Sequence, residues 1–323
     1  MSIGADFEDR TNPYRRELLA HCYRMLGSVH DAEDLVQETM LRAWRARGQF
    51  DGQRASLRTW LYRIATNACL TALAGRSRRP LPSGLGPASD DPEQPLVPAL
   101  DVPWLQPFPD AMLAPDRDDP ATALMSHGNL RLAFVAAVQL LPPRQRATLI
   151  LRDVLDFSAA EVADVLDTTP TAVNSALQRA RARLGDAGTG AGEIAEPTDP
   201  SSRALIDRYV TAFESADVAA LTRLLTDDAA LEMPPVPSWF SGREAYGRFI
   251  AHIFAIRGSA WRMIPIAANG QQAVAAYVLG DDGAYHAHTL QVLTVTGSGI
   301  SRNVTFQDSK LFATFGLPAS LTT

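Results

Sequence analysis

Residues 158–184 read SAAEVADVLDTTPTAVNSALQRARARL, and this stretch decides the fold of the chain's middle part. Ser158 followed three residues later by Glu161 is a capping box, which predicts a helix over 159–166. A short polar turn follows, and Pro170 suits the first turn of a second helix. Helix, short turn and helix together predict a helix-turn-helix.

The second of these helices carries polar side chains on the face opposite its apolar stripe. The stripe of Val173, Leu177 and Ala180 is expected to pack against Val162 and Leu166. Hydroxyl, amide and guanidinium groups on the opposite face suit base edges and phosphates in the major groove. The candidate residues are Thr171, Asn174, Ser175, Gln178, Arg179 and Arg183.

A second basic helix is expected in the first part of the chain. Ser56 is a plausible N-cap, and Leu57, Leu61 and Ile64 repeat at helical spacing. Arginine neutralises phosphates, and an aromatic ring can stack on an unpaired base. Thr66 is expected on the same outward surface as the residues predicted to contact nucleic acid, which are Arg54, Arg58, Thr59, Trp60, Arg63 and Asn67.

The helix before it has an acidic side. Leu35 and Val36 belong to its apolar stripe, and carboxylates lie opposite them. Such a face is either a solvated surface or a docking site for a basic partner. Its polar members are Asp31, Glu33, Asp34, Gln37 and Glu38.

Charge is distributed unevenly along the chain of 323 residues and net charge −6. Residues 1–79 and 130–185 are net basic, whereas 80–129 and 186–323 are net acidic. Basic blocks indicate an anionic partner. No apolar run approaches the ~20 residues that cross a bilayer, and no Cys/His cluster has zinc spacing. The cysteines Cys22 and Cys69 are expected as buried thiols, and neither metal nor cofactor is expected.

Four segments together resemble an extracytoplasmic-function (ECF) sigma factor of the sigma-70 type. They are HDAEDLVQE at 30–38, WLYRIATNAC at 60–69, LPPRQR at 141–146 and VNSALQRAR at 173–181. The resemblance implies a sigma-2 domain over 12–79 and a sigma-4 domain over 128–185. It implies core RNA polymerase (β′ clamp helices and β flap) and promoter DNA as partners. The acidic face would dock on the clamp helices, residues 50–67 would open and read the −10 element, and the 170–183 helix would read the −35 element.

Residues 80–127 are expected to be an acidic, proline-rich linker, with a flexible tether at 186–200. The island WLQPFPD at 104–110 is unusual, because exposed aromatic side chains in a tether need a docking place. We expect it to dock on the C-terminal domain through Trp104, Leu105, Phe108 and Asp110.

Residues 201–317 are expected to form an α+β domain. Helices are predicted at 201–215, 217–226 and 242–256, and strands at 229–233, 261–267, 272–279, 285–295 and 300–306. The segments YVTAF at 209–213, LLTDD at 224–228 and MPPVPSWFSG at 233–242 resemble a SnoaL-like domain, a cone-shaped fold with a deep pocket. The resemblance to ECF factors with such a fused domain implies regulation in cis.

A small-molecule ligand of this domain is a further expected partner. His286 or His288 could pair with Asp308 for acid–base chemistry, or the two histidines could hold a metal. The alternative is that these polar side chains are buried and satisfied without any ligand. The pocket candidates are Trp239, Trp261, Tyr277, His286, His288, Gln291, Asn303 and Asp308.

The sequence therefore predicts a multidomain, non-enzymatic, cytoplasmic initiation factor. Its all-α sigma-2 and sigma-4 domains precede an α+β SnoaL-like cone or barrel. Two other interpretations remain: a helix-turn-helix regulator that responds to a ligand, and a bifunctional protein with an enzymatic C-terminal pocket.

Overall fold

The computed structural model describes residues 3–75, 79–113, 127–186 and 199–322. The chain divides into two compact units, one of residues 1–79 with 112–189 and the other of residues 80–111 with 190–323. The greater part of the predicted linker thus belongs to the C-terminal unit. In the described part of the chain, no helix is both long and apolar enough to cross a membrane.

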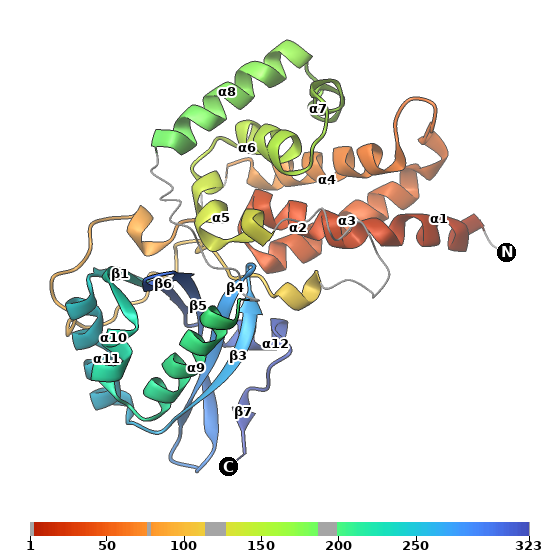
Figure 1. The fold of residues 1–323 in the computed structure, drawn as a ribbon. Helices are drawn as coiled ribbons and strands as arrows, with labels where there is room; N and C mark the ends of the chain where they lie inside the picture. Colours follow the sequence, from red (N-terminus) through yellow and green to blue (C-terminus); the bar gives the residue numbers. More distant parts are fainter. Residues whose placement is uncertain (1–2, 76–78, 114–126, 187–198, 323) are drawn as a thin grey trace. The chain divides into compact units, whose positions relative to one another are not determined.

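The first half of the helical unit is a small bundle (Figure 1). Ser28 and Ser56 cap two of its helices by accepting from backbone N–H groups of the first turn. The thiols Cys22 and Cys69 are free and buried, as predicted. The helices are α1 (Ile3–Thr11), α2 (Arg15–Leu26), α3 (Val29–Ala46) and α4 (Leu57–Leu73).

The second half of this unit contains the predicted helix-turn-helix. Ser158 and Glu161 form both hydrogen bonds of the capping box, and Asp167 ends the first helix in the left-handed conformation (φ 50°). Val162, Leu177 and Ala180 are buried between the two helices and their neighbours. The elements are α5 (Leu132–Gln139), α6 (Pro143–Leu149), a π-helical turn (Ile150–Val154), α7 (Ala159–Leu166) and α8 (Pro170–Asp186).

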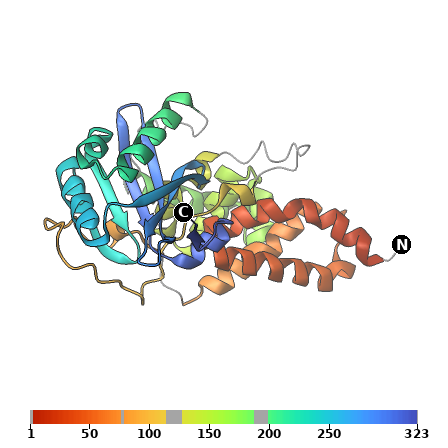
Figure 2. The same ribbon diagram turned by 90° about the horizontal axis from the view of Figure 1, so that it is seen from below.

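The C-terminal unit is a curved sheet with helices over one face (Figure 1 and Figure 2). The strand order is β2-β1-β6-β5-β4-β3, with β7 beside β5. β1 pairs with β6 in parallel and the other pairs are antiparallel. The elements are α9 (Pro200–Glu214), α10 (Val218–Arg223), β1 (Leu225–Met233), β2 (Val236–Ser241), α11 (Arg243–Arg257), β3 (Trp261–Ala268), β4 (Gln271–Leu279), β5 (Tyr285–Thr296), β6 (Gly299–Phe306), α12 (Ser309–Thr314) and β7 (Ser320–Leu321).

The α+β prediction is confirmed, with two corrections. The helix predicted at 217–226 ends at Arg223, because Leu225 already pairs with Ile300 of β6. The strand predicted at 229–233 is correspondingly longer, and β2 and α12 were not predicted. The strand β2 was not predicted because it contains Pro237, and proline is unusual inside strands except at the edge of a sheet. β2 is such an edge strand.

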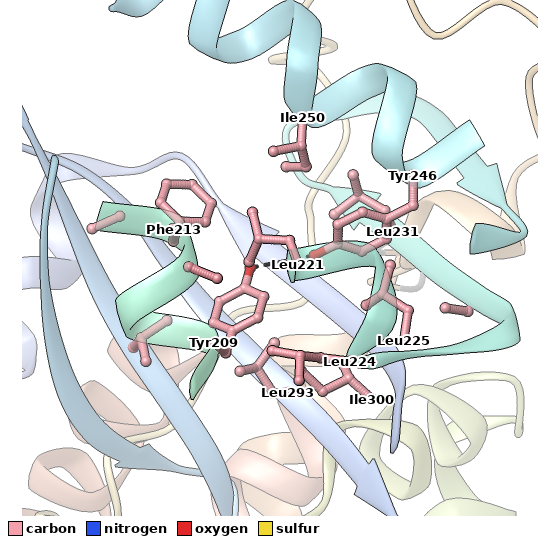
Figure 3. Close-up of a cluster of buried hydrophobic side chains, with 14 of the residues drawn as sticks. Tyr209, Phe213, Leu221, Leu224, Leu225, Leu231, Tyr246, Ile250, Leu293 and Ile300 are labelled. Carbon is pink, nitrogen blue, oxygen red and sulfur yellow. Dashed lines mark hydrogen bonds between the residues drawn. The ribbon is translucent and has the colours of Figure 1, made fainter. Parts of the chain in front are cut away.

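Apolar side chains from α9, α10 and α11 meet the sheet in one core (Figure 3). Phe213 contacts Phe254 and Trp261 edge to face, with ring centroids 5.1 and 5.4 Å apart. The labelled members of this core in Figure 3 are Tyr209, Phe213, Leu221, Leu224, Leu225, Leu231, Tyr246, Ile250, Leu293 and Ile300.

Candidate nucleic-acid interface

The acidic side of α3 is only partly free. Asp34 and Gln37 are exposed. Asp31 forms an ion pair with Arg79 (Nη2–Oδ2 2.7 Å), and Glu38 pairs with Arg42 one turn later (2.7 Å). The half-buried Glu33 completes the predicted set. Asp34 is therefore the most accessible carboxylate that this helix offers to a basic partner.

A groove of about 500 Å³ between α1 and α3 borders this acidic face. Its apolar lining from α3 consists of Met40, Leu41 and Trp44, and Leu41 is 43% exposed. Gln37 lies at the same groove. Sequence reasoning missed these apolar residues because their spacing equals that of an ordinary core stripe.

The basic helix α4 presents fewer of the predicted residues than expected. Arg54, Arg63 and Asn67 are exposed. Thr66 is 0% exposed, so its predicted outward placement is wrong, whereas Thr59 (6% exposed) is covered by Glu161 of α7 (Oγ1–Oε1 3.5 Å). Thr66 shares a hydrogen bond with the buried His21 (2.9 Å), and Thr59 lies in the first turn against the N-cap.

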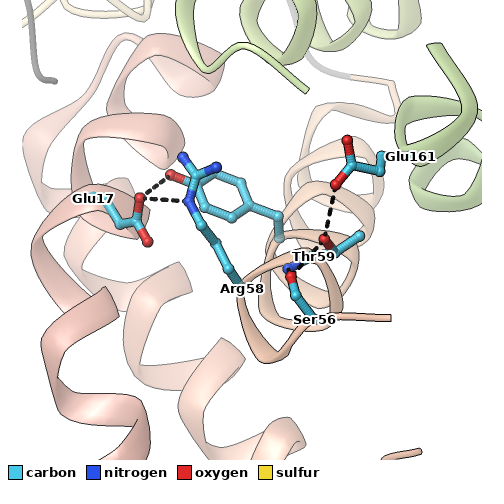
Figure 4. A network of polar contacts seen from close by, with 6 residues as sticks. Glu17, Ser56, Arg58, Thr59 and Glu161 are labelled. Atoms are coloured by element: carbon cyan, nitrogen blue, oxygen red, sulfur yellow. Dashed lines mark hydrogen bonds and ion pairs between the residues drawn. The ribbon is translucent and has the colours of Figure 1, made fainter. Parts of the chain in front are cut away.

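Arg58 is held in place rather than free in solvent (Figure 4). Its Nε donates to Glu17 Oε2 (3.0 Å), and the hydroxyl of Tyr62 donates to the same oxygen (3.2 Å). Its guanidinium also lies over the rings of Tyr62 and Phe157, at 5.1 and 4.7 Å from their centroids. Despite burial, the Tyr62 phenol and the Glu17 carboxylate raise the pKa of Arg58, which stays charged.

Trp60 is half-buried between two other aromatic side chains. Its ring centroid is 5.2 Å from that of Phe50 and 6.4 Å from that of Phe7. A ring supported in this way is a rigid platform of the kind on which an unpaired base can stack.

The outward face of α8 has the predicted residues. Thr171, Asn174, Gln178, Arg179 and Arg183 are exposed, whereas Ser175 is half-buried. The neighbouring Arg181 is tied to Asp153 by two hydrogen bonds of 2.9 and 2.7 Å, which buttresses α8 against the preceding turn. The exposed set combines amide and guanidinium groups that can bind base edges bidentately.

The island at 104–110 lies against the β3–β4 turn of its own unit. Phe108 N donates to Asn269 Oδ1 and Asn269 N donates to Phe108 O, both at 2.8 Å. Asp110 accepts from Gly270 N (2.9 Å), and Pro109 bridges Ala268. Leu105 and Phe108 are fully buried. Residues 108–110 of the linker are therefore held against residues 268–270 of the β3–β4 turn, largely by backbone hydrogen bonds.

The start of the linker has a separate attachment. Glu232 of β1 is fully buried and pairs with Arg302 of β6 (2.6 Å). Its other oxygen accepts from Ser83 N (2.9 Å). Trp239 of the edge strand β2 donates from its indole to Gly86 O (2.9 Å). The contact between Glu232 and Ser83 was not predicted from the sequence, because a carboxylate inside a strand is usually interpreted as a surface residue.

The pocket candidates of the C-terminal unit lie in different surroundings. Gln291 and Asn303 form a buried network with Tyr209 and Tyr246, in which Tyr209 donates to Gln291 (2.7 Å) and Asn303 to the Tyr246 oxygen (2.7 Å). Burial raises the pKa of both phenols, so they remain protonated. The Tyr277 hydroxyl instead donates to Pro318 O (3.0 Å).

The two histidines, His286 and His288, also lie in different environments. His286 is exposed and bonded to Asp282 (2.9 Å). His288 lies edge-on to Trp261 (5.1 Å), and burial lowers its pKa to about 4. Asp308 caps α12 by accepting from Lys310 N. Among the described residues, no group of three His, Cys, Asp or Glu side chains is arranged to hold a metal.

Three parts of the sequence match known domain families. Residues 12–79 match Sigma-70 region 2, residues 131–184 match Sigma-70 region 4, and residues 206–303 match the SnoaL-like domain. The ECF RNA polymerase sigma factor SigG of Mycobacterium tuberculosis (strain H37Rv) is 50% identical over 318 residues, covering 98% of this chain and 85% of the relative. The chain belongs to the ECF sigma factors of RNA polymerase.

A second relative carries the same fold. The ECF sigma factor SigJ of M. tuberculosis (strain H37Rv) is 28% identical to this sigma factor over 246 residues, covering 76% of the chain and 67% of the relative. The crystal structure of M. tuberculosis SigJ matches with a TM-score of 0.64 at 23% identity, covering 96% of this chain and 99% of that one. The predicted family and fold class are both confirmed.

Proposed function

We propose that this ECF sigma factor directs core RNA polymerase to promoters, with α3 docking on the β′ clamp helices. Region 2, at 12–79, reads the −10 element through α4, and region 4, at 131–184, reads the −35 element through α8 while it contacts the β flap. The observation that carries the proposal is the exposed row of Asn174, Gln178 and Arg179 on α8. Its partners are polymerase and chromosomal DNA, which implies a cytoplasmic protein.

Transcription on fragmented genomic DNA tests this function even though the promoter sequence is not specified. Adding the protein to core polymerase should create a defined set of new RNA 5′ ends. Arg179→Ala should weaken those starts by about ten-fold or more, because a good base contact is worth ~1–3 kcal/mol. Arg203→Ala is the matched control, an exposed arginine on α9 of the other unit. Random starts, or starts indifferent to Arg179→Ala, would contradict the proposal.

We further propose that the C-terminal domain regulates the factor in cis by binding the linker. The backbone pairing of Phe108 with Asn269 supports this, because a linker so bound is withheld from other partners. Asn269→Gly removes the acceptor but keeps the left-handed backbone (φ 58°) that glycine tolerates. Together with Trp104→Ala, it should change transcript yield without unfolding either unit, and unchanged yield would remove the idea.

We propose no catalytic role for the C-terminal domain. The support is that Tyr209, Gln291 and Asn303 already satisfy one another, and that Asp308 is engaged as a helix cap. Two rival functions make different predictions. A ligand-responsive regulator would bind specific DNA without core polymerase, and an enzyme would turn over a copurified ligand.

A further inference from the structure

One arginine of region 4 is already bound within the protein. The guanidinium of Arg181, on α8, forms a two-pronged ion pair with the carboxylate of Asp153 in the π-helical turn. The two bonds are Nε–Oδ2 at 2.9 Å and Nη2–Oδ1 at 2.7 Å. Arg179 and Arg183 of the same helix are exposed. The helix α8 therefore carries two arginines that DNA can reach and a third that is committed to a carboxylate.

Arg181 lies on the side of α8 that carries two of the proposed base-reading residues. It follows Asn174 by two turns and Gln178 by one, a spacing that places the three side chains on one face of a helix. Val173 and Leu177 mark the buried face of the same helix. A guanidinium beside the reading face lies close to the DNA backbone when such a helix enters the major groove. Without its carboxylate partner, Arg181 would therefore add a phosphate contact.

The carboxylate of Asp153 is presented from a fixed backbone. Ile150 and Leu151 of the same turn are fully buried. Phe157 N donates to Leu151 O (3.0 Å), which closes the segment that leads into α7. The side chain of Asp153 is 28% exposed, and that of Arg181 is 60% exposed. The ion pair is thus anchored at its acidic end, while an anion can reach its basic end.

Carboxylate and phosphate oxygens compete for the same guanidinium fork, because both accept two parallel N–H bonds from arginine. Contacts to phosphates strengthen binding to any DNA sequence and carry no sequence information themselves. The Asp153 carboxylate already satisfies the fork of Arg181. If Arg181 left it for the DNA, the unpaired carboxylate would face the phosphates and repel them. The ion pair therefore resists exchange with the DNA backbone.

We propose that Asp153 is a specificity-determining residue of region 4, which sets the stringency of promoter selection by withholding Arg181 from the DNA backbone. With Arg181 held, sequence-independent binding is weaker, and only sites that satisfy the base-reading residues of α8 are occupied. An ion pair with so exposed an arginine adds little to folding stability, which favours a role in recognition. The inference rests on the proposed function, since it requires that α8 reads DNA.

The salt dependence of DNA binding tests this role of Asp153. Full-length protein bound to core polymerase is titrated with a random-sequence DNA duplex at a series of salt concentrations, and the slope of log affinity against log salt is measured. Asp153→Asn should steepen that slope by about 0.9, the value of one additional phosphate contact in duplex DNA. Asp164→Asn removes the same charge from an exposed position on α7 and should leave the slope unchanged.

Variants of Arg181 separate a released cation from a mere loss of packing. Arg181→Gln breaks the same ion pair but frees no cation, so it should not steepen the slope. Asp153→Asn with Arg181→Gln should return the slope to that of the wild-type protein. Arg181→Lys keeps a cation but lacks the fork that Asp153 binds, so it should steepen the slope without any change at Asp153. Thermal melts of each variant check that region 4 remains folded.

The RNA 5′ ends made on fragmented genomic DNA measure the stringency itself. At equal and limiting protein concentration, Asp153→Asn should strengthen binding to every site about three- to five-fold, and so add weak starts to the wild-type set. An unchanged slope in Asp153→Asn, an equal change in Arg181→Gln, or an unchanged set of starts would each overturn the inference. Failure of the proposed function would show differently, as an absence of defined starts with the wild-type protein, and the salt slopes would still decide whether Arg181 is withheld.

Discussion

At the scale of single residues, carboxylates and buried imidazoles carry much of the electrostatic organisation. Glu17 receives hydrogen bonds from both Arg58 and Tyr62 and so fixes the position of Arg58, a residue of the predicted −10 surface. The sequence could not show this pairing, because Glu17 and Arg58 are 41 residues apart on different helices.

Glu17→Gln should therefore loosen Arg58. Hydrogen bonds to charged groups are worth more than neutral ones, and partial exposure reduces their value, so we expect a loss of about 1–2 kcal/mol in unfolding free energy. Denaturant unfolding of the helical unit measures it. Glu8→Gln, an exposed carboxylate on α1, is the control. Equal stability of both variants would mean that Glu17 is not a positioning residue.

His288 predicts a pH dependence for the C-terminal unit. Burial lowers its pKa from 6.5 to about 4, so the unfolded chain binds more protons between these values. Unfolding free energy should therefore fall as the pH drops from about 6.5 to 4, by up to roughly 3 kcal/mol from this group. Its two ring nitrogens are buried without a hydrogen-bond partner, so His288→Phe costs little at pH 7.

His288→Phe should flatten that part of the stability curve, and the exposed His286→Phe should not. Urea unfolding of the C-terminal unit between about pH 4 and 7.5 measures both, a range that spans the folded and unfolded pKa values. A curve of unchanged slope in His288→Phe would show that other groups cause the pH dependence.

At the scale of elements, the best predictions came from patterns that are local. The capping box at Ser158 and Glu161 fixes the start of α7, and the apolar spacing of Val173 and Leu177 fixes the buried side of α8. The antiparallel strands β3 to β6 were predicted within one residue of their observed bounds. Hydrogen-bond partners far apart in the chain were not predicted. The buried network of Tyr209, Gln291 and Asn303 is an example.

The linker shows this limit most clearly. Its prolines predict an extended segment, but they do not say where it binds. Phe108 pairs with Asn269 across 161 residues, and Ser83 with Glu232 across 149. Docking of the 104–110 island on the C-terminal domain was expected from its aromatic side chains. No sequence pattern indicated the attachment at Ser83.

Glu232→Gln should release the start of the linker. The substitution removes the ion pair with Arg302 and weakens the acceptor for Ser83 N, at a cost of about 2 kcal/mol in a partly solvated pair. Hydrogen exchange at Ser83 and Leu85 should accelerate, while exchange in α8 stays unchanged. Ser83→Pro removes the N–H donor while leaving the Glu232–Arg302 ion pair in place, and it should reproduce the faster exchange at Leu85. Unaltered protection there would contradict this attachment.

At the scale of the whole molecule, one chain combines two promoter-reading regions with a domain that binds the segment between them. The acidic residues on α3 mark the surface on which every proposed step depends, because a sigma factor acts only when bound to core polymerase. Of these, Asp34 is exposed, whereas Asp31 and Glu38 are already in ion pairs within the protein.

The most direct measurement is therefore the affinity of the full-length protein for core polymerase after charge reversal on α3. Asp34→Lys should weaken association about ten-fold or more, and adding Asp31→Lys and Glu38→Lys should abolish it, because close like charges oppose docking. Asp281→Lys, an equal charge change in an exposed hairpin of the C-terminal unit, should have no effect. Tight association that survives all three reversals on α3 would contradict the account.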